Sequence, residues 1–275
     1  GLLAISTSPV IARLLPLVPA AVIAFWRMTS ASAMLWGYSS IRPQESIAPK
    51  NIRLVIAAGF LLAMHFIFWF GALKLTSIAN TTILGIVAPA FTLLFERLWY
   101  RRKLSWITII ALLIIFVGGI IVQGNDLGYL QGSGLGNIMA ILSAVFLGSV
   151  FLIGSKVRKT TPVITYTRTV YTISAIVLLV SSLILDNLLF GYTKNDYFWL
   201  FMLGLIPTLI GHTAFSYSVK FVSPTVIAAI PLGEPIIASY LAWLLFAEKV
   251  PFYVIGGGLI ILIGLIILIM NKQSE

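Results

Sequence analysis

The sequence predicts an all-α polytopic membrane protein with about ten transmembrane helices, arranged as two inverted five-helix repeats. Of its 275 residues, 60% are hydrophobic and 9% are charged, whereas soluble domains carry about a quarter charged residues. Apolar runs of about 20 residues, the length that crosses a bilayer, alternate with short polar connections. Charges, prolines and glycines of the first half of the chain recur at fixed spacing in the second half.

The apolar runs give the expected helices in order. Their connections are mostly short, so consecutive helices should be antiparallel neighbours. The longest connections are residues 39–51 and the glycine-rich segment 123–134, which we expect to join the two halves. The first run lacks the basic segment and cleavage site of a signal peptide, so we interpret it as a shortened helix. The expected spans are 1–15, 20–40, 54–73, 77–99, 105–123, 136–156, 163–185, 197–219, 223–246 and 251–271.

The distribution of Lys and Arg predicts the orientation. With the N-terminus inside, twelve of the 18 basic residues fall on one side of the expected spans and four on the other. Basic residues favour cytoplasmic loops. We therefore expect a multi-pass protein of the cell (inner) membrane with both termini in the cytoplasm. The net charge of +10 then reflects topology, and no nucleic-acid partner is expected.

An internal repeat relates the two halves. A shift of 146 positions pairs Lys74 with Lys220, Pro89 with Pro235 and Gly118 with Gly264, while Arg27 and Arg168 pair at a shift of 141. Five spans are an odd number, so the second copy should be upside down relative to the first. We expect a first repeat over residues 1–123 and an inverted second repeat over residues 136–275. Transporters commonly bind substrate between such repeats.

The segment from Ser223 to Phe252 is the most informative. It is apolar and long enough to span a bilayer, yet Glu234 lies near its middle, directly before Pro235. A charge at membrane depth costs about 2.5–3.5 kcal/mol, so Glu234 should face a hydrated cavity. Pro235 removes a helix hydrogen bond there, and Gly233 would allow another backbone to approach. Glu234 is therefore a candidate for substrate binding and for proton coupling, or else a structural hydrogen-bonding group within the Gly-Glu-Pro break.

Other polar residues within the spans are candidates for binding a small-molecule substrate. His65 and Trp69 are four residues apart and therefore share one helix face. The guanidinium of Arg27 could bind a carboxylate through two parallel hydrogen bonds. Arg168, nearer the end of its span, is expected to reach the membrane surface. The full set of substrate-binding candidates is Arg27, His65, Trp69, Asn80, His212, Tyr217 and Glu234.

Structural roles compete with each of these assignments. Either histidine could be a hydrogen-bonded core residue, and Asn80, Thr81 and Thr82 could form a helix cap. Aromatic residues near span ends, among them Trp36, are typical of an interfacial belt. The glycines of the IGGGLI sequence, residues 255–260, should serve helix packing rather than phosphate binding.

Several function classes lack the residues they need. Two histidines and no cysteines leave no zinc cluster, and no cofactor is expected. No nucleotide-binding motif is present, so transport would depend on gradients. Single polar residues are spread through mid-span positions rather than clustered, which argues against an enzyme.

The arrangement resembles the drug/metabolite transporter superfamily, and it is most similar to the EamA-type branch of ten-helix metabolite exporters. The most specific part is LIPTLIGHTAFSYSVKFVSPTVIAAIPLGEPIIASYLAWLLFAEKV, residues 205–250. Residues 63–95 show a weaker form of the same pattern. The resemblance implies two inverted five-helix bundles around a central cavity and export of small metabolites such as amino acids. One departure is Arg102, which stands where the second half has Glu248.

We therefore predict a secondary transporter that exports small metabolites by alternating access around a cavity at the membrane midplane. Amino acids are the expected class of substrate. Its expected partners are a small-molecule substrate, the lipid bilayer and coupling protons, and it is expected to be a monomer. A nucleotide-sugar or phosphate-ester antiporter of the same superfamily is the alternative, although it would need several buried cations. A membrane-embedded enzyme or a lipid scramblase is the alternative of another class.

Overall fold

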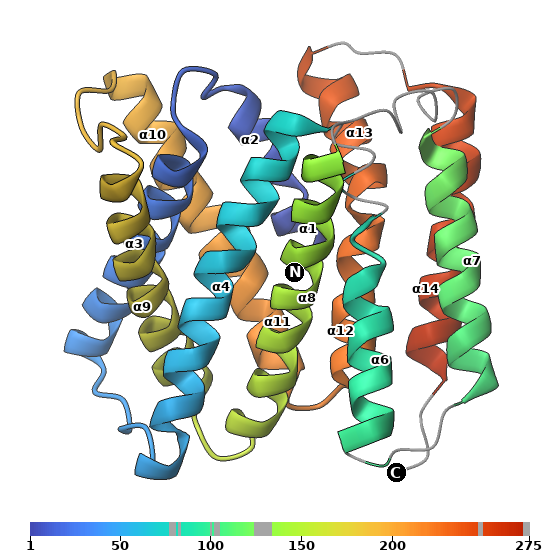
Figure 1. The fold of residues 1–275 in the computed structure, drawn as a ribbon, viewed down its shortest axis with the longest axis horizontal. Coiled ribbons are helices and arrows are strands. Elements are labelled where there is room, and N and C mark those ends of the chain that lie inside the picture. Colours follow the sequence, from blue (N-terminus) through green and yellow to red (C-terminus); the bar gives the residue numbers. More distant parts are fainter. Residues whose placement is uncertain are drawn as a thin grey trace.

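The computed structural model describes residues 1–76, 81, 84–99, 101, 105–123, 134–246 and 250–271, and every regular element in these ranges is a helix. Figure 1 shows the helices side by side, with their ends at two opposite edges of the molecule. Within the described ranges, six helical segments are long and apolar enough to cross a membrane, and two shorter apolar segments accompany them. The predicted all-α polytopic membrane protein is confirmed.

Most expected spans are single helices close to their predicted bounds. The helix α4 starts five residues before its expected span because Pro49, whose missing N–H costs nothing in a first turn, opens it. Residues 77–80, 82 and 83 of the expected span 77–99 lie outside the described residues. The single helices are α3 (Ala20–Ile41), α4 (Pro49–Leu75), α6 (Val87–Trp99), α7 (Trp106–Gln123), α8 (Gly134–Val157), α9 (Val163–Ile184) and α14 (Phe252–Met270).

Three expected spans contain changes of helix type. The first consists of α1 (Leu2–Ile5) and α2 (Thr7–Arg13). The eighth consists of α10 (Lys194–Leu203), a π-helical segment η2 (Gly204–His212) and α11 (Thr213–Ser218). The ninth consists of α12 (Pro224–Ala229), a 3₁₀ turn η3 (Ile230–Gly233) and α13 (Glu234–Phe246). Prolines lie in η2 and η3, where a missing N–H shifts the hydrogen-bond ladder.

Helix pairs build the bundle. The helix α3 packs against α9, α4 against α8, α6 against α12 and α7 against α14. One buried apolar cluster joins α3, α4 and α9, and a second joins α7 and α14 to Val226, Ala229 and Leu232. The pairs α3–α9 and α7–α14 lie at opposite ends of the bundle in Figure 1. The helices between them, together with α3, surround the cavity described below.

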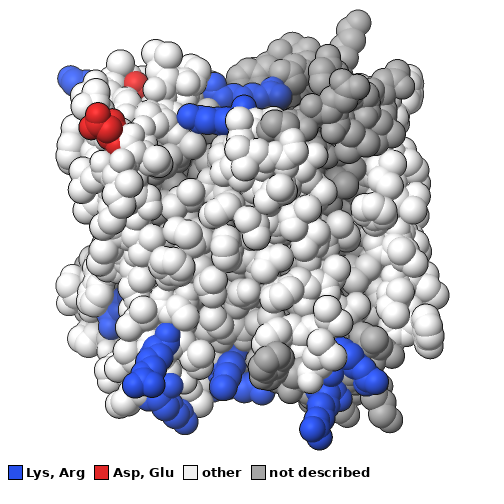
Figure 2. Space-filling view, in the orientation of Figure 1, with Lys and Arg blue, Asp and Glu red and all other residues white. Residues whose placement is uncertain are grey.

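Basic residues gather at one edge. In Figure 2, Lys and Arg line the lower edge, whereas the upper edge shows fewer basic residues together with acidic ones. The helices α3, α6, α8 and α14 all end at the lower edge in Figure 1. Gly1 lies at mid-height, and α1 and α2 run from there towards the upper edge, in the direction the sequence predicts.

Glycines bring α7 and α14 into close contact. A Cβ atom on Gly257 would lie 2.6 Å from the backbone nitrogen of Val122 and 2.7 Å from the carbonyl oxygen of Gly118. A Cβ on Gly258 would meet the Ile236 side chain at 3.1 Å, whereas one on Gly256 would meet nothing within 4 Å. The predicted packing role of these glycines is confirmed for Gly257 and Gly258, and Gly256 faces outward.

This difference gives a matched pair of substitutions. Gly257→Ala should destabilise the protein by about 1–3 kcal/mol, because backbone atoms cannot move aside as a flexible side chain would. Gly256→Ala, one residue away, should leave stability unchanged or slightly raised, since alanine favours helix. Thermal unfolding in detergent measures both. Equal midpoints for the two variants would contradict the packing of α7 on α14.

Candidate functional site

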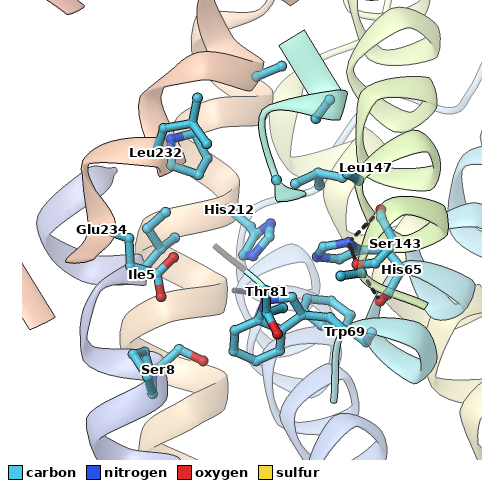
Figure 3. A pocket seen from close by; sticks show the side chains of 18 of the residues that line it. Ile5, Ser8, His65, Trp69, Thr81, Ser143, Leu147, His212, Leu232 and Glu234 are labelled. Atoms are coloured by element: carbon cyan, nitrogen blue, oxygen red, sulfur yellow. Dashed lines mark hydrogen bonds between the residues drawn. The ribbon is translucent and has the colours of Figure 1, made fainter. Parts of the chain in front are cut away.

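A cavity of about 110 Å³ lies within the bundle, lined by residues of α1, α2, α3, α4, α6, α8 and the segments from η2 to α13. Figure 3 shows side chains from several of these helices pointing towards it. Its walls are mainly apolar, with a small group of polar and aromatic side chains among them. These are Ser8, Arg27, His65, Trp69, Thr81, Ser143, His212 and Glu234.

Arg27, on α3, is held by three contacts. Its side chain is 1% exposed. Nε donates a hydrogen bond to Thr208 Oγ1 at 2.6 Å, and Nη1 donates to Ser8 Oγ at 3.0 Å. The guanidinium carbon lies 4.5 Å from the ring centroid of Phe66, a cation–π distance. These contacts fix the guanidinium at the cavity wall and leave part of its hydrogen-bonding fork for a ligand.

The π-helical segment η2 positions the acceptor of Arg27. Pro207 lies inside η2, and the Thr208 hydroxyl donates to the Leu203 carbonyl at 2.9 Å, so its oxygen accepts the hydrogen bond from Arg27. A Cβ on Gly204 would lie 2.5 Å from Ser30 Cβ and 3.1 Å from the Arg27 carbonyl. The missing side chain therefore lets η2 approach α3 closely enough for this bond.

His65, on α4, is oriented by Ser143 of α8. Its Nδ1 lies 3.0 Å from the Ser143 carbonyl oxygen and 2.8 Å from the Ser143 hydroxyl, which itself donates to the His65 carbonyl at 3.1 Å. A carbonyl only accepts hydrogen bonds, so we assign the proton to Nδ1. In the neutral ring Nε2 is then an acceptor. Figure 3 shows the opposite edge of the ring turned towards the cavity.

Glu234 opens α13 directly after the 3₁₀ turn. Its carboxyl group points into the cavity in Figure 3. Among the described residues, this carboxyl group has no hydrogen-bond donor and forms no ion pair with Arg27 or any other cation. The alternative structural role of bracing the break is therefore not seen. A Cβ on Gly233 would meet the Leu2 side chain at 3.1 Å, so a side chain, and not the backbone we expected, approaches there.

Aromatic rings form part of the wall. The His212 ring lies 5.5 Å from Phe66 and 6.2 Å from Phe215, edge to face in both cases. Trp69 packs edge to face on Phe70 at 4.8 Å, one turn of α4 beyond His65. Aromatic faces of this kind can bind apolar or cationic parts of a ligand.

The structure brings together five of the seven predicted binding residues: Arg27, His65, Trp69, His212 and Glu234 all line the cavity. Tyr217 is not among the residues that line it. It is 53% exposed and packs on Phe221 at 5.3 Å. Phe215, two residues earlier, lines the cavity, and two residues turn a helix by about 200°, so Tyr217 faces outward. Asn80 lies outside the described residues, as does Thr82.

Sequence reasoning missed the hydroxyl groups that hold the charged side chains. Ser8, Ser143 and Thr208 carried no signal, because serine and threonine occur throughout membrane helices and bond to their own backbone. Thr208 directly follows Pro207, and this mid-span proline was the one feature of the sequence that indicated an irregular helix there. Thr81, considered as part of a cap, is 4% exposed and lines the cavity. Arg168 lies outside the cavity lining.

A model of the EamA-like transporter family matches residues 1–123 and 134–270, nearly the whole chain. The chain belongs to the EamA-like transporter family. The resemblance inferred from the sequence is thereby confirmed, and the helices around the cavity are those of a transporter.

Individual relatives of this EamA-like transporter are consistent with the family assignment. It is 25% identical over 244 residues to the uncharacterized transporter YxxF of Bacillus subtilis, covering 87% of this chain and 77% of YxxF. It is 24% identical over 260 residues to the pseudopaline exporter CntI of Pseudomonas aeruginosa, covering 93% of this chain and 88% of CntI. A solved crystal structure has the same fold, with a TM-score of 0.83 at 16% identity, covering 100% of this chain and 96% of that one.

The Arg27–Thr208 contact can be tested in this EamA-like transporter. Thr208→Val should lower the thermal unfolding midpoint, because a hydrogen bond to a charged group contributes about 1.5–3 kcal/mol. The control is Thr167→Val, a buried threonine whose hydroxyl bonds only to carbonyls of its own helix. If both variants unfold at the same temperature, the contact does not stabilise the site.

Proposed function

We propose that this protein is a secondary transporter that exports a small polar metabolite, with amino acids as the first candidates, by alternating access around the cavity. The observation that carries the proposal is the convergence of Arg27, His65, His212 and Glu234 on one cavity within a membrane bundle. Such groups are costly at membrane depth and mark substrate or ion pathways. Energy would come from an ion gradient.

The chemistry of the wall favours a zwitterion. Arg27 offers a cationic fork that matches a carboxylate, and Glu234 offers an anion that matches an ammonium group. Within the described residues these two side chains do not pair with each other, although both line the cavity. A ligand with both charges could bridge them, and Phe66 and Trp69 would contact its apolar part.

The size of the cavity favours a small ligand. At about 110 Å³ it is a small cavity. A nucleotide sugar would need a much larger space and several cations for its phosphates. The described lining residues include one arginine and no lysine. These observations favour a metabolite of amino-acid size over the antiporter alternative.

Two relationships support alternating access between inverted repeats. The helices α3 and α9 come second in the two proposed halves, α6 and α12 belong to the fourth spans, and α7 and α14 to the fifth. Each of these pairs packs together, as equivalent elements near a two-fold axis would. In Figure 1, α7 and α14 run in opposite directions, as inverted copies require. Both halves contribute to the cavity wall.

The outward direction and the orientation are parts of the same proposal. The relative from Pseudomonas aeruginosa is named an exporter. The Lys- and Arg-rich lower edge in Figure 2 would face the cytoplasm of a cell with this protein in its inner membrane. We further propose that it works as a monomer, because the residues that line the cavity come from a single chain.

Counter-transport in proteoliposomes tests the function. The purified protein should exchange at least one radiolabelled amino acid from a panel, and a pH gradient should drive its accumulation. Glu234→Gln should abolish accumulation driven by the pH gradient and retain exchange, because the amide cannot bind and release a proton. Glu45→Gln, at an exposed position, is the control. Undiminished pH-driven accumulation by Glu234→Gln would refute proton coupling through this residue.

Arg27→Lys tests recognition of a carboxylate. Lysine keeps the charge and loses the planar fork. We expect the KM for the transported amino acid to rise about tenfold or more, since a hydrogen bond to a charged group is worth about 1.5–3 kcal/mol. With the parent protein, the methyl ester of the same amino acid should compete poorly with the amino acid for transport. If Arg27→Lys leaves both KM and the discrimination against the ester unchanged, Arg27 does not bind the carboxylate.

A further inference from the structure

A second polar cluster lies away from the cavity, where α3 and α9 pack together. It consists of Ser32 and Trp36 of α3 with Arg168 and Thr172 of α9. The transport site does not use these residues, because none of them lines the cavity. They belong to a different surface of the molecule.

This surface faces lipid. Arg168 and Thr172 continue along α9 to Ile176 and Val180, each four residues further on and therefore on one face of the helix. Ile176 is 54% exposed and Val180 is 49% exposed, as apolar residues in contact with acyl chains would be. Trp36 is 48% exposed on the neighbouring helix. Figure 2 shows basic atoms on the flank that α3 and α9 form, above the lower edge.

Hydrogen bonds fix the indole of Trp36. Its Nε1–H donates to Thr172 Oγ1 at 3.0 Å, and Ser32 Oγ lies 2.7 Å from the same oxygen. The Thr172 hydroxyl uses its own proton to bond the Arg168 carbonyl at 2.7 Å, so Ser32 must be the donor in its contact. Thr172 thus accepts two hydrogen bonds and donates one. The indole is held as a flat platform beside Arg168.

The guanidinium of Arg168 stacks on this platform without any other partner among the described residues. Its central carbon lies 4.4 Å from the Trp36 ring centroid. Nε is buried and has no hydrogen-bond partner, and no described side chain forms an ion pair with the guanidinium. One acidic residue is linked to this part of α9. The backbone carbonyl of Glu45 accepts a hydrogen bond from Thr165, which lies one turn before Arg168. An arginine has five N–H donors, so this cation needs an acceptor that the described residues do not supply.

The depth of the cluster points to that acceptor. Arg168 is five residues after the start of α9, and Trp36 is five residues before the end of α3. At 1.5 Å per residue both lie about 8 Å from the basic edge, within reach of the phosphate layer for an arginine side chain. Basic residues near a membrane surface attract anionic lipids, and a guanidinium binds phosphate through two parallel hydrogen bonds.

We propose that Trp36 and Arg168 form a binding site for the phosphate group of an anionic phospholipid, in the leaflet at the Lys- and Arg-rich edge. Thr172 and Ser32 act as positioning residues that hold the indole. The site is independent of the transported substrate. Its occupant is a lipid because Arg168 opens onto the acyl-chain face and not onto the cavity.

Fluorescence quenching tests the site. Phosphatidylglycerol and phosphatidylcholine with brominated acyl chains are added separately to the purified protein in detergent micelles, and the contribution of Trp36 is the difference between the parent and Trp36→Phe. We expect brominated phosphatidylglycerol to quench Trp36 at about fivefold lower mole fraction than brominated phosphatidylcholine. One basic group near a membrane contributes about that factor. Arg168→Gln should remove the preference.

Two control variants distinguish this site from general attraction to the basic edge. Arg53→Gln removes a cation from an exposed position near the start of α4, and should preserve the preference. Glu45→Gln should also preserve it. Equal quenching of Trp36 by the two lipids, measured as the difference between the parent protein and Trp36→Phe, would overturn the proposal. A preference that appears only in Glu45→Gln would also overturn it, since Glu45 would then be the partner of Arg168.

Discussion

Burial of a guanidinium at membrane depth is the constraint on which the rest of the site depends. A charged group in the middle of a bilayer costs at least about 2.5–3.5 kcal/mol when it has no polar surroundings. Arg27 is 1% exposed, and it is stabilised by Ser8, Thr208 and the face of Phe66, which come from three further helices. Arg27 also lines the cavity, so an anionic group bound there could accept hydrogen bonds from the N–H donors that Ser8 and Thr208 do not use.

The π-helical segment η2 and the 3₁₀ turn η3 have a common explanation. Backbone groups without a helical partner are tolerated within a membrane only where protein or a wet cavity surrounds them. The π-helical segment ends at His212, and the 3₁₀ turn ends directly before Glu234. Both residues line the same cavity. The breaks therefore place ionisable side chains where a ligand or water can contact them, and the loss of regular hydrogen bonds is confined to that site.

Much of this arrangement could be predicted from the sequence, and the reason is physical. Long apolar runs locate the helices because only a helix satisfies its own backbone in lipid, and ionisable residues within them must face inward or reach the surface. That argument found Arg27, His65, His212 and Glu234. It could not find Ser143 or Thr208, whose hydroxyls can bond to their own helix and therefore occur on any face. It could not tell which way Tyr217 faces, because an aromatic ring is stable on either face of a membrane helix.

The most direct test of a cavity that opens alternately to the two sides uses the absence of cysteine from the sequence. Ala144 is 5% exposed and lines the cavity, whereas Ile176 is 54% exposed on the lipid-facing side. A charged, membrane-impermeant thiol reagent, added to either side of sealed vesicles, should label Ala144→Cys from both sides in separate experiments, and substrate should slow the labelling. Ile176→Cys should react poorly from either side. Failure of Ala144→Cys to react from either side, or reaction from one side alone under all conditions, would contradict alternating access.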